Sequence, residues 1–191
     1  MSHPRAPILL LMCGVAFSGK TTLSRRIAAR CGHKRISLDE LNAARGLGHI
    51  GPEDIPLEEW ERSSHDAARQ IDSLLQHGQD VVLDDTNCYR FLRDRYRAVA
   101  LRHAAPCLLV HLPLTLEQGL ARIAGNRIER SRPDFPEPLY RFHFAQMEAP
   151  EADEPHLIFL PDEDPLEWVT RHESRLRHGA DNAASFRRGP P

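Results

Sequence analysis

The sequence lacks any long apolar run. No stretch of its 191 residues approaches the roughly 18 consecutive apolar residues that a membrane-spanning helix needs. The N-terminal segment MSHPRAPILLLMC holds a shorter apolar run that a glycine-rich loop follows at once, so we interpret it as a strand and not as a signal peptide. We therefore expect a cytoplasmic protein with no membrane partner.

Cysteine and histidine occur without the spacings that build metal cages or disulfide frameworks. The four cysteines form no C-x-x-C pair, and the eleven histidines show no spacing typical of metal ligands. These patterns predict neither a structural metal site nor a disulfide-stapled fold, and they favour a reducing compartment.

An excess of positive charge is also missing. The chain has 25 Lys and Arg against 27 Asp and Glu, which gives a formal net charge of -2. Domains that hold nucleic acid by bulk charge usually carry a strong basic excess, so the sequence does not indicate that class. A local basic patch stays compatible with these numbers.

Short apolar runs alternate with amphipathic helical patterns along the chain. The runs cover residues 7–13, 35–38, 80–84, 106–112 and 156–160. Between the first two, Leu23, Ile27 and Cys31 recur every four residues, and residues 57–78 carry a longer apolar stripe that includes Trp60. Such alternation predicts an α/β fold with a five-stranded, mostly parallel sheet and helices on both faces.

The domain organisation follows from what separates these segments. No repeat of fixed period and no Gly-, Ser- or Pro-rich linker divides the chain, so we expect one domain over residues 1–175. Residues 176–191 lack apolar periodicity, and we expect them to form a disordered tail.

A glycine-rich loop joins the first expected strand to the first expected helix. The pattern G-x-x-x-x-G-K-[ST] is matched by Gly14, Gly19, Lys20 and Thr21. Backbone N–H groups of such a loop point at phosphate oxygens, and the helix start adds its positive dipole end. The residues expected to hold the nucleotide are Gly14, Ala16, Phe17, Ser18, Gly19, Lys20, Thr21 and Thr22.

This loop predicts a P-loop NTPase three-layer fold with ATP and Mg²⁺ as cofactors. Lys20 would reach the β- and γ-phosphates, and the Thr21 hydroxyl would be a ligand of Mg²⁺. The alternative is an ordinary glycine-rich turn between a strand and a helix.

Three acidic residues lie at expected strand ends. Asp84 and Asp85 end the third apolar run, and Asp39 follows the second. Because the carboxyl ends of parallel strands meet at one crevice, these acids and the glycine loop should share it. We expect Asp84 or Asp85 to serve the metal and Asp39 to orient an acceptor hydroxyl. The alternative is that residues 85–87 and Asp39 cap the helices that follow them.

Arginines gather in two places that could meet phosphate. Four precede Pro133, namely Arg122, Arg127, Arg130 and Arg132. We interpret this segment as an arginine lid over the triphosphate, with Arg127 the first candidate and Arg122 the second, although a solvated cationic helix end would look the same. Arg90 and Arg93, after the third strand, are further candidates for an anionic substrate.

The order of these parts resembles a known family. The glycine loop, SLDE, VVLDDTNCYRFLRDRYRAVA, the arginine-rich stretch and RFHFAQMEAPEADEP together are similar to P-loop kinases of the polynucleotide-kinase type, a group that includes seryl-transfer-RNA(Sec) kinase. The resemblance covers roughly residues 7–160. It implies that Asp39 is the general base, and its D-T-N motif matches Asp85, Thr86 and Asn87.

One position departs from that family. Polynucleotide kinases usually carry an arginine three residues after the basic aspartate, where this sequence has Asn42, with Arg45 further on. The departure weakens the case for a nucleic-acid 5′-end as acceptor and leaves the kinase chemistry unchanged.

Taken together, the sequence predicts an ATP-dependent kinase that moves the γ-phosphate to a hydroxyl. The acceptor, a small metabolite or an RNA or tRNA end, should bind between Asp39 and the segment 45–65. One alternative is a regulatory switch that binds and hydrolyses ATP without a dedicated acceptor. Another is a toxin-like nucleotide-sugar kinase.

Overall fold

Five parallel strands form the centre of the protein. The computed structural model describes residues 5–51 and 54–179. Its strands are β1 (Leu9–Cys13), β2 (Lys34–Ser37), β3 (Val81–Asp84), β4 (Cys107–His111) and β5 (His156–Ile158). They pair in the order β2-β3-β1-β4-β5, and every pair is parallel. The predicted α/β fold with a five-stranded sheet is confirmed.

Helices fill the connections between these strands, and one more helix follows β5. They are α1 (Lys20–Cys31), α2 (Leu38–Ala44), α3 (Leu57–Gln76), α4 (Arg90–Arg102), α5 (Leu116–Glu129), α6 (Glu137–Ala145) and α7 (Pro165–His178). Within the described residues, no helix is long and apolar enough to cross a membrane.

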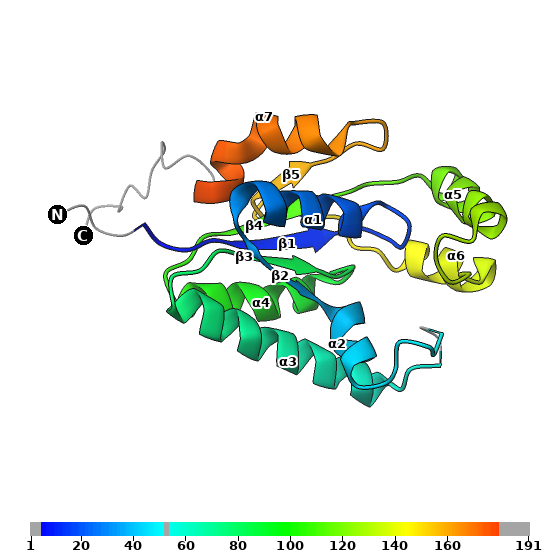
Figure 1. Cartoon of the computed structure of the whole chain (residues 1–191), viewed down its shortest axis with the longest axis horizontal. Coiled ribbons are helices and arrows are strands. Elements are labelled where there is room, and N and C mark those ends of the chain that lie inside the picture. The colour runs from blue at the N-terminus through cyan, green and yellow to red at the C-terminus, as the bar shows by residue number, and fades with distance from the viewer. Residues whose placement is uncertain (1–4, 52–53, 180–191) are drawn as a thin grey trace.

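The sheet separates two apolar cores (Figure 1). On one face, α1 and α7 pack on alternate strand residues such as Leu10 and Met12. On the other, α3 and α4 pack on the intervening residues such as Leu9 and Leu11, and Trp60 lies against this second core as its place on the stripe predicted. Because both faces are covered, every residue of β1 is buried, which explains its continuous apolar sequence.

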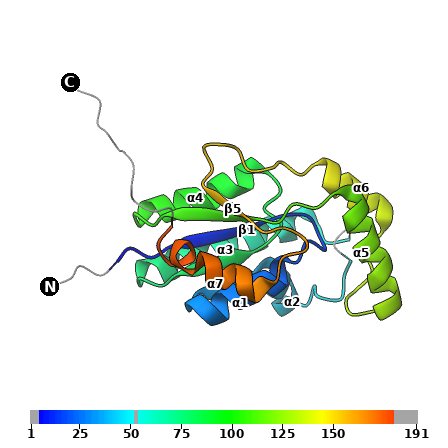
Figure 2. The same cartoon turned by 90° about the horizontal axis from the view of Figure 1, so that it is seen from above.

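Helices α5 and α6 lie beyond the carboxyl ends of the strands, where the arrow of β1 points (Figures 1 and 2). They pack on the glycine loop through a third apolar cluster that includes Phe17, Phe135 and Tyr140. A Cβ atom at position 119 in α5 would collide with the Tyr140 side chain, so only glycine fits there. The expected lid is therefore a packed pair of helices above the loop.

The last helix closes the first core. Asp164 caps α7 by accepting hydrogen bonds from the backbone N–H groups of Leu166 and Glu167. Arg177 of α7 donates to the Cys31 carbonyl of α1 at 2.8 Å, and α7 continues to His178. Residues 180–191, which make up most of the predicted tail, lie outside the described part of the chain.

Buried His33 should make the fold sensitive to acid. Burial lowers the pKa of His33 to about 4; Asp80 opposes this shift, whereas Arg5 and Arg177 reinforce it. In the unfolded chain His33 is protonated below about pH 6.5, whereas in the folded protein it stays neutral until the pH falls to about 4. Stability should fall by about 3 kcal/mol as the pH drops through this window.

Urea denaturation between pH 4 and 7 measures this effect. His33→Leu should flatten the acid limb of the unfolding free energy, whereas the same change at exposed His65 of α3 should leave it as in the wild type. If the unfolding free energy changed with pH in the same way in both variants, groups other than His33 would be responsible for the acid sensitivity.

Candidate active site

The glycine loop runs from β1 to the first turn of α1. A Cβ atom on Gly14 would lie 2.8 Å from the Leu112 carbonyl oxygen, and the Gly14 N–H donates to the Thr86 carbonyl at 3.0 Å. Gly19 precedes α1 with φ of 101°, a conformation that glycine adopts without strain. Both glycines of the motif are thus required by the local geometry.

Lys20 lies at the centre of the site. Its Nζ donates to the Val15 carbonyl of the same loop at 2.7 Å. Burial lowers the pKa of Lys20, and the carboxylates of Asp84 and Asp85 oppose that shift. The ammonium group is therefore held inside the loop by protein acceptors that phosphate oxygens could replace.

Asp84 and Asp85 differ in how freely they could serve a metal. One Asp84 oxygen accepts from the Ser24 hydroxyl at 3.0 Å and from Arg35 Nη2 at 2.6 Å, and its side chain is nearly fully buried. Asp85 is half-buried. Burial raises the Asp85 pKa, and the N–H groups of the two following residues and Lys20 oppose that shift. Among the residues that the structure describes, no arginine pairs with Asp85, and its carboxylate interacts electrostatically with Lys20.

The turn after β3 is built around Asn87. This residue is buried with φ of 44°, and its Nδ2 donates to the Met12 carbonyl at 2.7 Å. The N-cap of α4 is Tyr89, which makes no side-chain capping bond. The alternative that residues 85–87 cap this helix is therefore wrong, and the turn instead fixes the D-T-N motif beside β1.

Asp39 lies in the first turn of α2, two residues after the N-cap Ser37. The alternative that Asp39 itself caps this helix is therefore also wrong. Its side chain is accessible to solvent. Neighbouring protein atoms that displace water raise the Asp39 pKa, as does Asp84; Lys20, Arg132 and Arg35 oppose this. A carboxylate with these neighbours is suited to accept a proton next to bound phosphate.

The lid arginines occupy different surroundings. Arg127 is exposed and bonds Asp134 at 2.9 Å, and Arg122 donates to the Phe17 carbonyl at 2.9 Å, so it braces the glycine loop. Arg132 instead places its guanidinium 4.0 Å from the centre of the Phe17 ring, and burial lowers its pKa, opposed by Asp39. Of the four, Arg132 faces both the loop and Asp39.

Arg90 and Arg93 are both engaged by acidic residues. Arg90 pairs with Glu151 at 2.7 Å and with Asp153 at 2.5 Å. Arg93 is fully buried and bonds Glu154 at 2.8 Å. These pairs hold the segment before β5 against α4, so the structure does not support the expectation that either arginine meets a substrate anion.

Arg45 joins α2 to α3. Its Nη1 bonds Asp66 at 3.0 Å, and its Nη2 contacts the Asn42 side chain at 3.0 Å and the Ser63 hydroxyl. Arg45, the arginine that follows Asn42, is therefore a structural link between the two helices.

The side chains present fit a magnesium–nucleotide complex. Among the described residues, no group of three or more His, Cys, Asp or Glu could hold a metal by itself. Mg²⁺ usually takes one or two protein oxygens and completes its shell with phosphate and water. Thr21 and Asp85 would supply such oxygens, and Lys20 with the loop amides would receive the phosphates.

A parallel sheet whose first strand runs through G-x-x-x-x-G-K-T into a helix defines a P-loop NTPase. A family model described as an AAA domain matches residues 9–149. This match spans more than half of the chain, so the protein belongs to that family. No curated protein matches the chain.

Several solved structures share the fold. A putative kinase from Chloroflexus aurantiacus is 17% identical, with a TM-score of 0.70 over 90% of this chain and 98% of its own. A sugar kinase from Janibacter sp. is 21% identical, with a TM-score of 0.67 over 88% and 93%. The APS kinase of Mycobacterium tuberculosis, in complex with AMPPNP and APS, is 16% identical, with a TM-score of 0.64 over 91% and 99%. The likeness to P-loop kinases is confirmed at the level of the fold.

Proposed function

We propose that the protein is an ATP-dependent kinase that transfers the γ-phosphoryl group to a hydroxyl acceptor. The observation that carries the proposal is that the glycine loop with Lys20, Asp39 in the first turn of α2 and the Arg132 guanidinium over the Phe17 ring gather at the carboxyl ends of the parallel strands. A binding module would need the lysine, but it would not need a solvent-accessible carboxylate and a lid guanidinium beside it.

Each of these residues has a role in the reaction. Lys20 and the loop amides bind the phosphates, and Arg132 neutralises charge on the transferring group from the lid side. Thr21 and Asp85 would hold Mg²⁺, which would supply positive charge to neutralise the phosphates. The glycine loop and the packed lid exclude water from around the phosphoryl group.

Asp39 orients the acceptor. Its carboxylate accepts a hydrogen bond from the attacking hydroxyl and takes the proton as the new P–O bond forms, while the bond between the γ-phosphorus and the β-phosphate oxygen breaks and ADP leaves. Because phosphoryl transfer passes through a loose transition state, positioning and charge neutralisation should contribute more than proton removal. Because Asp39 belongs to α2, the acceptor binds on the α2 side of the crevice, opposite the lid.

The acceptor class is tested with γ-labelled ATP and Mg²⁺ in the presence of separate pools. These are 5′-hydroxyl RNA and DNA, tRNA, nucleotide sugars and a fraction of neutral hydroxylated metabolites. Label that moves to one pool, and fails to move in Asp39→Asn, supports a kinase and names its acceptor. Release of free phosphate that no pool changes would instead support a hydrolysing switch.

Asp39→Asn should lower the turnover number by about 10² with little change in the KM for ATP, because the lost group acts on the acceptor. The wild-type rate should also fall as the pH drops through the raised pKa of Asp39, since only the carboxylate accepts the proton. The variant should lack this limb in a pH profile of kcat. A limb that survives unchanged in the variant would assign the titration elsewhere.

Arg132→Ala should reduce turnover by about 10², which is typical of removing one donor to a transferring group. Arg127→Ala should reduce it by less than about 3-fold, because Arg127 bonds Asp134 on the exposed side of the lid. Steady-state rates at saturating ATP compare the two variants directly. A larger loss of turnover in Arg127→Ala than in Arg132→Ala would indicate that Arg127, and not Arg132, contacts the transferring phosphoryl group.

A further inference from the structure

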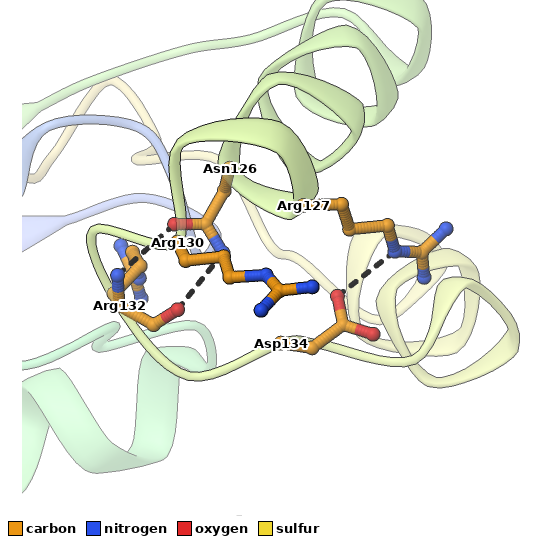
Figure 3. A pocket seen from close by; sticks show the side chains of 5 residues that line it. All are labelled: Asn126, Arg127, Arg130, Arg132 and Asp134. Carbon is orange, nitrogen blue, oxygen red and sulfur yellow. Dashed lines mark hydrogen bonds and ion pairs between the residues drawn. The ribbon is translucent and has the colours of Figure 1, made fainter.

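The loop after α5 is organised around one buried amide. Asn126 is 6% exposed, and its Oδ1 accepts hydrogen bonds from the Ser131 hydroxyl and the Arg132 N–H, both at 3.1 Å. Its Nδ2 donates to the Arg132 carbonyl at 3.0 Å (Figure 3). A longer contact of 3.5 Å joins the same Nδ2 to the Pro133 carbonyl. Both ends of the amide are thus engaged by three consecutive residues of the loop.

The same residue also ends the helix. Its backbone carbonyl accepts from the Arg130 N–H at 2.6 Å, and Arg130 then adopts φ of 51°. A left-handed residue reverses the chain direction at this point. The loop therefore leaves α5 and folds back over the Asn126 side chain within a few residues.

This arrangement sets the position of Arg132. Asn126 binds both the N–H and the carbonyl of Arg132, so the backbone that carries the guanidinium is fixed on both sides. The guanidinium lies 4.0 Å from the Phe17 ring centre, and Phe135 packs edge-on against the same ring at 6.3 Å. The loop is thereby anchored on α5 at one end and on the glycine loop at the other.

Arg130, in the same loop, differs from Arg132 in its surroundings. Among the described residues it has no hydrogen-bond or ion-pair partner for its side chain, and it is exposed beside a hollow of about 390 Å³. Only Ser131 separates it from Arg132, yet only Arg132 is held at both backbone groups by the Asn126 amide.

We infer that Asn126 is a positioning residue, whose two-sided hydrogen bonds to the Arg132 backbone hold that guanidinium over the glycine loop for phosphoryl transfer. The inference rests on the proposed function. Asparagine suits the task because its amide both donates and accepts, whereas aspartate could only accept and alanine could do neither.

A double-mutant cycle measures this coupling. The variants are Asn126→Ala, Arg132→Ala and the double variant, with Asn126→Asp as a same-size replacement that keeps the acceptor contacts. We expect Asn126→Ala to lower kcat for ATP consumption by about 10-fold or more, and the double variant to be no slower than Arg132→Ala. Losses that multiply in the double variant would overturn the inference. A purely structural role would lower thermal stability without this non-additivity.

A second readout does not depend on activity. Limited trypsin digestion followed by mass spectrometry reports cleavage of the Arg130–Ser131 bond, which should become at least about 10-fold faster in Asn126→Ala and Asn126→Asp. Glu137→Gln, which removes an exposed ion pair with Arg141 on α6, is the control and should cleave at the wild-type rate. Unchanged cleavage in both Asn126 variants would overturn the inference. If the wild type consumes no ATP, the proposed function fails, while this comparison still decides whether Asn126 holds the loop.

Discussion

Replacing Lys20 with alanine should lower the rate of ATP turnover by about 10³-fold or more. The ammonium group is enclosed by the glycine loop, so its removal takes a positive charge from the place where phosphates must bind and leaves Asp85 without this cationic neighbour, whereas Asp84 keeps its bond to Arg35. Both binding and transition-state stabilisation should suffer, and the loss should exceed that in Asp39→Asn. Initial rates of ADP formation at several ATP concentrations measure both effects.

The matched control is Lys34→Ala. Lys34 lies at the start of β2, where it is exposed, so its removal should leave turnover close to that of the wild type. Thermal melts of both variants establish that they fold. Near-normal turnover in Lys20→Ala and Asp39→Asn alike would contradict the assigned mechanism.

Glu154→Ala should lower the free energy of unfolding by about 3–5 kcal/mol, which is the usual cost of leaving a buried charge without its partner. Both side chains of the Arg93–Glu154 pair are inaccessible to solvent, and two parallel bonds of 2.8 Å join them. Arg93 also donates to the carbonyls of Asn87 and Glu148, so the turn after β3 depends on it. Denaturation in urea, followed by circular dichroism, measures the loss.

A double variant separates the charge from the packing. Arg93→Met with Glu154→Leu removes both charges and keeps apolar volume, so it should be more stable than Glu154→Ala alone. The carbonyls of Asn87 and Glu148 lose their donor in this variant, which should keep it below the wild type. A double variant less stable than the single one would show that the hydrogen bonds from Arg93 to these carbonyls stabilise the fold by more than its unpaired buried charge costs.

Most of the fold could be predicted from the sequence because strands buried on both faces must be apolar throughout. Each of the five apolar runs corresponds to a strand of the sheet, with ends that differ by one or two residues. The glycine loop could be placed because its backbone geometry requires Gly14 and Gly19. Asp39, Asp84 and Asp85 meet at one edge because the strands are parallel.

The roles of the arginines could not be predicted in the same way. Arg127 and Arg132 are equivalent in type and close in sequence, and their surroundings differ only through tertiary contacts with Asp134 and Phe17. Arg35 of β2 pairs with Asp84 of the neighbouring strand β3, and the hydrophobic periodicity of the sequence does not predict that contact. Sequence patterns report which residues face a core, but they do not report which charge finds which partner.

The shared apolar cluster of the lid and the glycine loop limits how the lid can be exchanged between related proteins. Phe17 belongs to the loop, yet it packs with Phe135 and Tyr140 of the lid, while Gly119 makes room for the tyrosine ring. A chimera that imported only residues 115–145 from a relative would meet the wrong side chain at position 17. Position 17 and the lid must therefore be transplanted together, and mutations at one should select compensating changes at the other.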